Sequence, residues 1–562
     1  MDSHSLKSSG FSQWLLLGLL LIFTLLWFSN LEYRKLANPD EGRYAEIPRE
    51  MVLSGDWVTP RLNDLKYFEK PPLQYWATAA AFRVFGESHW AARWWPATTS
   101  FGCVLLMFWA GRRLFGEEIG LAAAAALGGC TGFVINAHVN TLDAGLAAFL
   151  TVGLLGFLLA QRPGATPAEN RNWMLVVWAA MALAVLSKGL IGVVLPGAVL
   201  AIYLLIERDW RLLTRLHFGK GLALFLLIAV PWFVAVSLAN DEFARFFFIH
   251  EHFARFLTKV HHREGAWWYF IPILLFGAMP WLPFIAVQLR DGWRREGEPG
   301  TLQSRRLLLI WAAFIFLFFS VSGSKLPSYI LPVFPALALF AAMEMQRMAP
   351  ATLSHFAWGL AATGGVLLLV VLVSGARIAH MFSKESSPFE IVRNVVPWIG
   401  ASIFVFTAGA VVAAWSFRRY GRSIGIVALA LGSLGAGIMA LGGYDELSRL
   451  SSSYYLVREI EARQGPFDRT LPFYSVQMYD QTLPFYLKRP VTLVEYVDEF
   501  ALGLNAEPDK GIQRVEDWKK RWAALDQGYA ILSPSNYEQI AAGGLPMRVL
   551  ARDPRRVIVS RR

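Results

Sequence analysis

The sequence predicts an all-α polytopic membrane protein with a small α/β domain at its C-terminal end. Of its 562 residues, 55% are hydrophobic and only 17% are charged, and the mean hydropathy is +0.40. Most of the chain is a series of apolar segments, each close to the roughly 20 residues that a helix needs to cross a bilayer. After residue 443 the sequence becomes polar and rich in turn signals. This balance is typical of a membrane protein and excludes an ordinary soluble enzyme.

The apolar segments, taken in chain order, predict about thirteen crossings. No small-residue cleavage site follows the first segment before Glu32, so we expect a retained helix rather than a cleaved signal peptide. The short segment 74–86 is interrupted by Arg83, and we expect it to form a juxtamembrane helix at the interface. The expected crossings are Trp14–Phe28, 91–111, 119–137, 142–160, 173–187, 189–206, 219–239, 267–289, 307–322, 329–346, 357–378, 396–417 and 423–442.

Basic residues in alternate connections support this count. With a cytoplasmic N-terminus and no crossing at 74–86, every inward connection carries Lys or Arg, as the positive-inside rule expects. A crossing at 74–86 would move most of these connections outside. The same rule, with anionic lipid headgroups, explains the net charge of +11 without a nucleic-acid partner. Everything after Gly443 is then expected outside the cytoplasm, and Cys103 and Cys130, both in apolar segments, predict no disulfide.

The first expected outside loop holds carboxylates beside a cation. Asp40 and Glu41 lie between a proline and a glycine, so we expect a turn to present them. A carboxylate in such a place can act as a general base or bind a metal. A turn cap, or an ion pair with Arg43, explains Asp40 equally well. Further along the loop, Lys70 can bind a phosphate at headgroup depth, although snorkelling explains an isolated lysine too.

Other polar side chains are expected on the same outside face. Asp143 begins a crossing, where the helix dipole alone would favour an acid. Lys188 lies between two apolar segments with almost no loop and is either a functional cation or a membrane-edge lysine. Lys325 and Tyr329 lie in a proline-rich segment, and irregular backbone at membrane depth indicates a cavity.

The loop 241–265 combines a candidate metal ligand with a cation. His250 could bind a metal, with Glu69 as the second ligand, or it could simply solvate the headgroup region. The sequence lacks the His-Glu-x-x-His pattern that places two histidines on one helix face. Arg255 could hold a phosphate.

Residues 444–562 predict the α/β domain. Short β-like segments at 470–476, 491–494 and 529–533 alternate with helical stretches at 453–462 and 515–525. There is no Walker loop and no dinucleotide fingerprint in it. A role as a lid or a docking surface is a hypothesis.

Several motifs together resemble those of the protein mannosyltransferase-like branch of the GT-C membrane glycosyltransferases, and within it the aminoarabinose transferases of Gram-negative bacteria. The resemblance rests on 38–44, 69–73, Lys188-Gly189, 324–329 and 331–332. It implies a GT-C fold whose membrane domain spans 1–442, with a catalytic outside loop at 30–90 and a periplasmic domain at 443–562. It also implies transfer of 4-amino-4-deoxy-L-arabinose from undecaprenyl phosphate to lipid A phosphates at the periplasmic face of the inner membrane, giving resistance to polymyxin and cationic peptides.

The resemblance also implies roles for particular residues. Asp40 would be the catalytic acid or base and Asp143 its acidic partner, with Arg43 and Glu41 completing the catalytic group. Lys70, Arg255, Lys325, Tyr329 and Lys188 would hold the carrier phosphate, and Glu69 and His250 a zinc-like divalent ion. The expected partners are the undecaprenyl phosphate-linked donor, the lipid A acceptor and membrane lipids, and the expected state is a monomer.

Two alternatives stay open from the residues alone. A flippase of lipid-linked sugars would also need many helices and a cationic cavity, although such proteins often contain repeats that this sequence lacks. The same fold could instead transfer another polyprenyl-linked sugar to a protein hydroxyl or a glycan.

Overall fold

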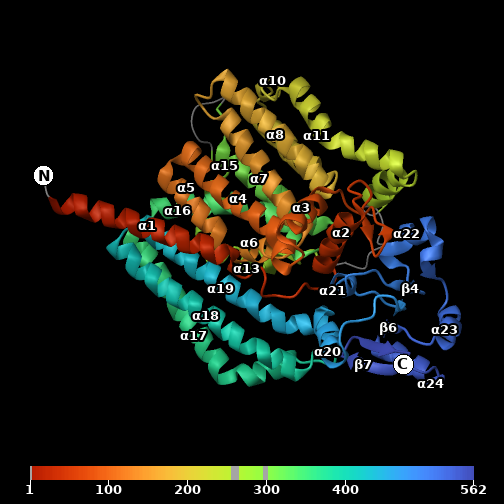
Figure 1. The fold of residues 1–562 in the computed structure, drawn as a ribbon. Helices are drawn as coiled ribbons and strands as arrows, with labels where there is room; N and C mark the ends of the chain where they lie inside the picture. Colours follow the sequence, from red (N-terminus) through yellow and green to blue (C-terminus); the bar gives the residue numbers. More distant parts are fainter. Residues whose placement is uncertain (1–2, 255–264, 295–300, 562) are drawn as a thin grey trace.

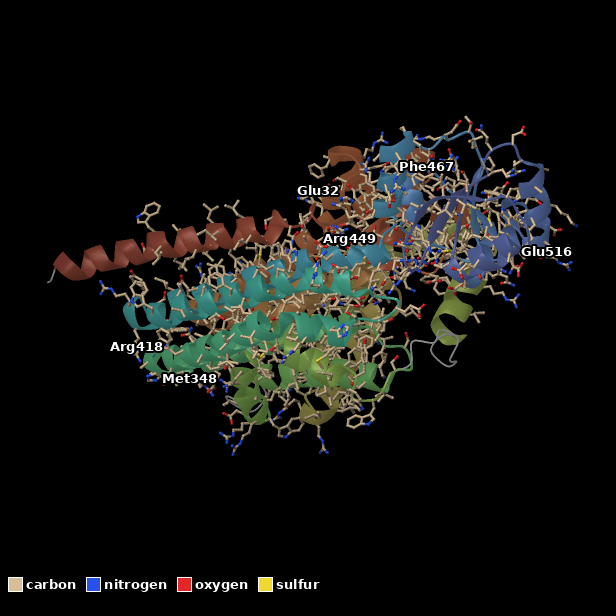
Figure 2. All side chains as sticks on the ribbon, turned by 90° about the horizontal axis from the view of Figure 1, so that it is seen from below. Glu32, Met348, Arg418, Arg449, Phe467 and Glu516 are labelled. Carbon is tan, nitrogen blue, oxygen red and sulfur yellow. The ribbon has the colours of Figure 1, made fainter. Side chains whose placement is uncertain are left out.

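The computed structural model describes residues 3–254, 265–294 and 301–561, with side chains omitted before Gln13 and at 250–254. A bundle of helices makes up most of the molecule, and a domain that contains a β-sheet lies at one end of it (Figure 1). Figure 2 shows Met348 and Arg418 at the bundle end far from this domain, whereas Glu32 and Arg449 lie at the near end. The chain therefore has a long apolar body between two polar ends.

In the described part of the chain, seven helices are long and apolar enough to cross a membrane, or up to nine if each of two bent pairs counts as one span. This agrees with a multi-pass membrane protein of mostly helical structure. The seven are α7 (Leu142–Gln161), α11 (Phe218–Ala239), α15 (Ser304–Val321), η2 with α16 (Pro327–Arg347), α17 (Pro350–Phe382), α18 (Phe389–Arg419) and α19 (Arg422–Ser451). Other long or apolar helices are α1 (Ser3–Ser29), α4 (His89–Phe115), α8 (Pro167–Lys188) and α9 (Ile191–Glu207).

Two expected crossings are bent pairs of helices instead of single continuous helices, and each pair still counts as one possible span. The segment 119–137 divides into α5 (Glu117–Gly129) and α6 (Thr131–Ala137), which meet at 65° because the backbone of Cys130 is extended. The segment 267–289 divides into α13 (Phe270–Gly277) and α14 (Leu282–Asp291), which meet at 111°. Pro280 lies in the break, where a proline lacks the N–H that a helix would need.

The loop after α1 forms its own small layer against the bundle. Its elements are α2 (Asp40–Ser54), the hairpin of β1 (Arg61–Leu62) and β2 (Leu65–Lys66), and α3 (Leu73–Phe85). The expected turn covers Asn38 and Pro39 only, because Asp40 is already the first residue of α2. The helix dipole favours the two acids in the first turn of α2. Gly55 ends the helix in the left-handed conformation, with φ 74°. The 13 residues of α3 are too few to cross a bilayer, as expected for 74–86.

The loop after α11 contains η1 (Arg245–Ala254), a π-helix. Phe243 and Phe247 stack with ring centroids 5.3 Å apart, and both pack in a buried cluster with Trp232 and Phe68. The side chain of His250 lies outside the described residues, and so does all of Arg255.

The C-terminal domain is built on a six-stranded sheet in the order β5-β4-β3-β6-β8-β7, which agrees with the expected α/β class. The first four strands in that order run parallel to one another. β8 runs antiparallel to both of its neighbours, β6 and β7. The strands are β3 (Phe473–Val476), β4 (Thr492–Val494), β5 (Gly511–Ile512), β6 (Tyr529–Leu532), β7 (Arg548–Arg552) and β8 (Val557–Ser560). The helices are α20 (Tyr454–Gln464), α21 (Leu483–Leu487), α22 (Ala501–Ala506), α23 (Val515–Ala524) and α24 (Pro534–Ala542), with short turns η3 (Asp498–Phe500) and η4 (Pro508–Lys510).

The two faces of this sheet pack against different partners. Val476 and Val494 point to the face that Trp518 of α23 covers, whereas Leu493 points to the opposite face. That opposite face shares one buried cluster with residues of α2 such as Ile47. Alternation along the strands thus lets one small sheet bury its own helices on one side and the membrane-domain loop on the other.

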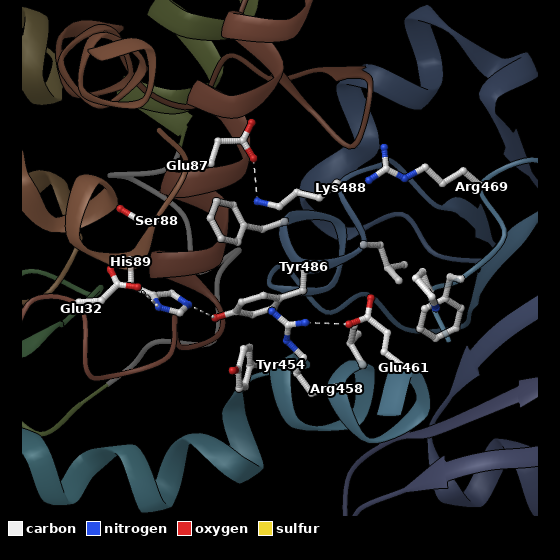
Figure 3. Close-up of a pocket in the computed structure, with 15 residues that line it drawn as sticks. Glu32, Glu87, Ser88, His89, Tyr454, Arg458, Glu461, Arg469, Tyr486 and Lys488 are labelled. Atoms are coloured by element: carbon white, nitrogen blue, oxygen red, sulfur yellow. Dashed lines mark hydrogen bonds and ion pairs between the residues drawn. The ribbon is translucent and has the colours of Figure 1, made fainter. Parts of the chain in front are cut away.

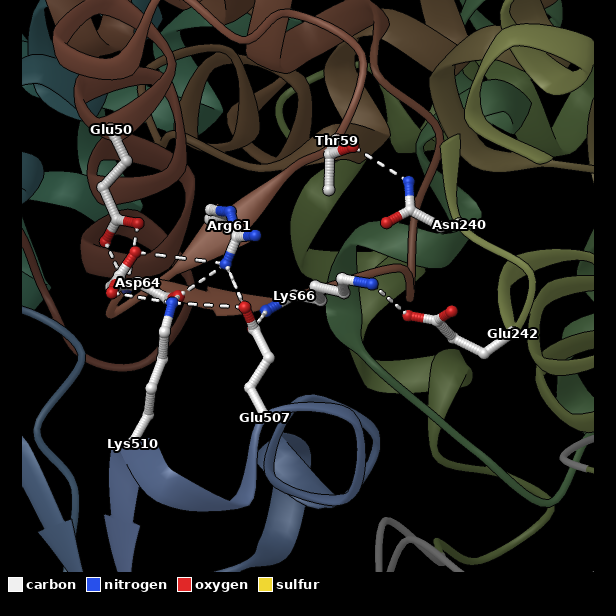
Figure 4. A network of polar contacts seen from close by, with 9 residues as sticks. All are labelled: Glu50, Thr59, Arg61, Asp64, Lys66, Asn240, Glu242, Glu507 and Lys510. Carbon is white, nitrogen blue, oxygen red and sulfur yellow. Dashed lines mark hydrogen bonds and ion pairs between the residues drawn. The ribbon is translucent and has the colours of Figure 1, made fainter. Parts of the chain in front are cut away.

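Ion pairs reinforce the same junction around the β1–β2 hairpin (Figure 4). Arg61 pairs with Glu507 at 3.0 Å, and Asp64 with Lys510 at 2.8 Å, both partners belonging to the C-terminal domain. On its other side the hairpin reaches the loop just after α11, where Lys66 pairs with Glu242 at 2.7 Å. The hairpin therefore connects the C-terminal domain to the loop that contains η1.

Candidate active site

Seven of the eleven predicted site residues line one narrow pocket, here called the central pocket. It lies where α2, the segment before α3, the start of α7, the end of α8 and η2 meet. The seven residues are Asp40, Arg43, Glu69, Lys70, Asp143, Lys188 and Tyr329. The predicted convergence of these polar side chains on one side of the molecule is therefore present in three dimensions.

Arg43 connects the first acid of the central pocket to the C-terminal domain. Its guanidinium is 3.1 Å from Asp40 Oδ1 and 2.6 Å from Glu499 Oε2. Burial raises the pKa of Glu499, and the charge of Arg43 opposes that rise. Glu499 is absent from the sequence-based predictions, because no local motif marks it and only the tertiary contact with Arg43 reveals it.

Asp143 is held from two sides in the same pocket. Lys188 forms an ion pair with one carboxylate oxygen, and Ser328 donates a hydrogen bond of 2.8 Å to the other. The Lys188 ammonium also lies 4.3 Å from the ring centroid of Tyr329. Lys188 is thus paired inside the pocket and is not an isolated lysine at the membrane edge. Asp143 enters the pocket from the first turn of α7, as its position in the sequence indicated.

Lys70 and Glu69 enter the pocket from the segment before α3. The Lys70 ammonium donates a hydrogen bond of 2.8 Å to the backbone carbonyl of Glu69. Together with Arg43 and Lys188, Lys70 supplies positive charge around three carboxylates, those of Asp40, Glu69 and Asp143. Such a set of cations can stabilise a phosphate, and a carboxylate beside it can accept a proton.

The structure corrects the catalytic assignment of Glu41. Its side chain is buried and accepts hydrogen bonds of 2.7 and 2.9 Å from the guanidinium of Arg93. The backbone N–H groups of Ala37 and Asn140 donate to it as well, each at 3.1 Å. Burial alone would raise the pKa of Glu41, but the charge and hydrogen bonds of Arg93 lower it to about 2. Glu41 therefore binds three segments together and is outside the lining of the central pocket.

Lys325 also differs from its predicted role. Its ammonium donates hydrogen bonds to the carbonyls of Ser320 and Ser322, at 2.8 and 2.6 Å, so it caps the end of α15. A cation at this end of a helix is favoured by the unpaired carbonyls and the dipole. The next residue, Leu326, lines the central pocket in its place.

Gly42 lets the C-terminal domain approach the first turn of α2. A Cβ at this position would lie 2.6 Å from the backbone carbon of Gln481, which is closer than real Cβ contacts come. Gly42→Ala is therefore expected to separate the domain from α2 and to lower the free energy of unfolding by about 1–3 kcal/mol. Thermal unfolding of the purified protein measures this effect. Gly102→Ala in α4, where a Cβ meets nothing within 4 Å, is the matched control and should be neutral; equal stability of both variants would contradict the close contact.

Comparison with known proteins places the chain among sugar transferases. The family of dolichyl-phosphate-mannose-protein mannosyltransferases matches residues 12–247, and the aminoarabinose transferase C-terminal domain matches residues 456–561. The undecaprenyl phosphate-α-4-amino-4-deoxy-L-arabinose arabinosyl transferase of Pectobacterium carotovorum is 32% identical over 435 residues, covering 75% of this chain and 76% of the relative. The enzyme of the same name from Aeromonas hydrophila is 33% identical over 394 residues, covering 69% and 71%.

A solved structure resembles the whole chain. The crystal structure of ArnT from Cupriavidus metallidurans bound to undecaprenyl phosphate is 37% identical, covers 98% of both chains and superposes with a TM-score of 0.90. Its apo form is similar, with a TM-score of 0.89. The similarity therefore includes the bundle, the loop after α1 and the C-terminal domain.

Proposed function

Because the chain belongs to the family of undecaprenyl phosphate-α-4-amino-4-deoxy-L-arabinose arabinosyl transferases and is a membrane glycosyltransferase, we propose that it transfers 4-amino-4-deoxy-L-arabinose to phosphates of lipid A. The donor is the undecaprenyl phosphate-linked sugar, and the product would give resistance to polymyxin and cationic peptides. The observation that carries the proposal is the central pocket, where Asp40 and Asp143 lie among Arg43, Lys70 and Lys188.

The reaction exchanges one phosphate for another at the anomeric carbon of the sugar. The bond from this carbon to the carrier phosphate breaks, and its electron pair leaves with the phosphate oxygen. An oxygen of the acceptor phosphate then bonds to the carbon. In our proposal Lys70, Lys188 and Tyr329 face the departing phosphate, where fixed positive charge stabilises the growing negative charge. Arg255 joins them in the proposal, although it lies outside the described residues.

Asp40 has the role of positioning the acceptor in this scheme. The acceptor phosphate is already anionic, so its activation demands less proton removal than that of an alcohol. Asp40 orients the acceptor and accepts any proton that remains on it, and Arg43 holds Asp40 in place at 3.1 Å. Asp143, paired with Lys188, is the second acid of the site.

The proposal includes thirteen crossings and a defined orientation. The connections expected in the cytoplasm include those at Arg347 and Arg418, and Figure 2 shows Arg418 and the neighbouring Met348 far from the C-terminal domain. We therefore place the central pocket and residues 443–562 on the periplasmic face of the inner membrane. The proposal takes a monomer as the working state.

A divalent, zinc-like ion at Glu69 and His250 remains part of the proposal. Glu69 lines the central pocket, and within the described ranges no group of three or more His, Cys, Asp or Glu side chains could hold a metal by itself. No step above depends on the ion. Chelation followed by gel filtration is expected to lower the transfer rate, and added zinc to restore it. Transfer that survives complete removal of the metal would exclude this part.

The test of the function is reconstitution of the purified chain with the undecaprenyl phosphate-linked donor and lipid A. Mass spectrometry should show a pentosamine added to lipid A only when both substrates and the protein are present. If a folded protein forms no product with lipid A, other phosphorylated or hydroxylated acceptors become the candidates, and movement of the donor across vesicles tests the flippase alternative.

A further inference from the structure

A second pocket, here called the lateral pocket, lies between the membrane domain and the C-terminal domain (Figure 3). Glu32, Glu87 and His89 line it from the membrane domain, and residues of α20, the α20–β3 connection and α21 line it from the C-terminal domain. Its volume is about 390 Å³, within the size range of pockets that hold small ligands. The described residues around it include none of those that line the central pocket.

The two pockets are neighbours across a short stretch of chain. Tyr486, which lines the lateral pocket, accepts a hydrogen bond of 2.9 Å from the backbone N–H of Leu36. The next residue, Ala37, donates to Glu41, the neighbour of Asp40 in sequence. Leu36, Ala37 and Glu41 are all buried, so this stretch is packed protein that couples the wall of the lateral pocket to the start of α2.

The side chains of the lateral pocket combine an aromatic wall with a charged rim. The rings of Tyr454 and Tyr486 lie with centroids 5.2 Å apart, and Phe485 packs against Tyr486 at 5.4 Å. At the rim, Lys488 pairs with Glu87 at 2.7 Å, and His89 lies 3.2 Å from both Glu32 and the Tyr486 hydroxyl. A sugar ring has apolar C–H faces and a polar edge, which this combination matches.

One cation of the lateral pocket is available for an anion. Among the described residues, the guanidinium of Arg469 has no hydrogen-bond or ion-pair partner, and the residue is exposed. Figure 3 shows Arg469 and Lys488 both extending from the C-terminal domain. An arginine fork binds phosphate through two parallel hydrogen bonds.

The lateral pocket also lies beside apolar side chains that reach the surface. Glu32 follows the end of α1 by three residues, and His89 is the first residue of α4. Close to them in sequence, Tyr33, Val84 and Phe85 are 48%, 72% and 53% exposed. Apolar side chains at the end of an apolar helix fit the acyl region of a lipid, with the pocket at the depth of the headgroup.

From this geometry we infer that the lateral pocket binds a phosphorylated sugar of the acceptor glycolipid, with its phosphate on Arg469. The inference rests on the proposed function for the identity of the acceptor. It assigns the C-terminal domain most of the lining of an acceptor-binding site, beyond its packing on α2.

The test measures binding and transfer separately. The binding probe is a deacylated glucosamine disaccharide that carries two phosphates, titrated into the detergent-solubilised full chain. Arg469→Glu is expected to weaken its binding about tenfold, the effect of losing a charged hydrogen bond. In transfer assays this variant should raise the KM for lipid A while kcat and the KM for the donor stay unchanged. The matched control is Arg463→Glu, because Arg463 is an exposed arginine of the same domain that pairs with Glu459 outside the pocket.

The binding assay does not depend on the transfer reaction. A failed transfer reaction would therefore count against the proposed function, whereas the binding result alone tests the inference. Three outcomes would overturn the inference. The disaccharide does not bind, Arg469→Glu binds it as tightly as the wild type does, or inorganic phosphate binds as tightly as the disaccharide and displaces it. Nanodiscs with phosphatidylglycerol provide the last arm. Nanodiscs with lipid A serve as the comparison. If both kinds of nanodisc displace the disaccharide equally, the pocket recognises any anionic lipid and the sugar assignment is wrong.

Discussion

Asp40→Asn is expected to reduce the rate of sugar transfer by about 10²–10⁴-fold, the usual contribution of a positioned acid or base. The amide cannot take a proton from the acceptor. It also loses the ion pair with Arg43, which in our proposal keeps the side chain at position 40 oriented toward the acceptor. The fold should survive, because the Asp40 side chain is 27% exposed and Arg43 keeps its contact of 2.6 Å with Glu499. Loss of one acid from the first turn of α2 costs at most about 1 kcal/mol.

The measurement is the initial rate of pentosamine addition to lipid A, with the thermal unfolding midpoint recorded on the same samples. Asp64→Asn is the matched control, because Asp64 is an exposed acid of the same loop that pairs with Lys510 outside the central pocket. It should transfer at the wild-type rate. An Asp40→Asn variant that retains transfer within a few-fold would remove Asp40 from the mechanism.

Glu41→Gln should act on stability, in contrast to its neighbour. The change leaves the buried guanidinium of Arg93 without a countercharge, and breaking a buried pair by removing one partner costs about 3–5 kcal/mol. The expected result is a large fall in the thermal midpoint and in the yield of folded protein. The fraction that folds should retain a transfer rate far above that of Asp40→Asn.

The pH dependence of stability gives a second reading of the same pair. The pKa of Glu41 is about 2 in the folded protein, below its ordinary value of 4.5. A depressed pKa means that the pair contributes its stability above pH 4.5 and loses it as the pH falls toward 2. Between those values the wild type should lose stability more steeply than Glu41→Gln.

Glu118→Gln is the control for Glu41→Gln, since the exposed Glu118 pairs with Arg422 at 3.8 Å and should contribute less than about 1 kcal/mol. If Glu41→Gln were as stable as this control, the buried pair would have no structural role.

Local patterns in the sequence predict a multi-pass helical protein and seven of the residues that line the central pocket. Apolar segments of about 20 residues predict membrane helices because only a helix of that length satisfies its own backbone across the hydrocarbon. Charges such as Lys188 and Asp143, placed at the ends of such segments, were predicted to meet on one face, and both line the central pocket. The polar tail after residue 443 indicated the α/β domain, whose sheet the structure contains.

Tertiary structure alone decided which polar side chains face the central pocket. Asp40 and Glu41 are neighbours in α2, yet one lines the pocket and the other is buried against Arg93. Successive side chains on a helix point about 100° apart, so packing with other segments determines their roles. The same reason explains Lys325, which caps α15, and Glu499, which reaches Arg43 from the C-terminal domain. Segment length and local charge are properties of the sequence, whereas the partner of each charge depends on contacts between distant segments.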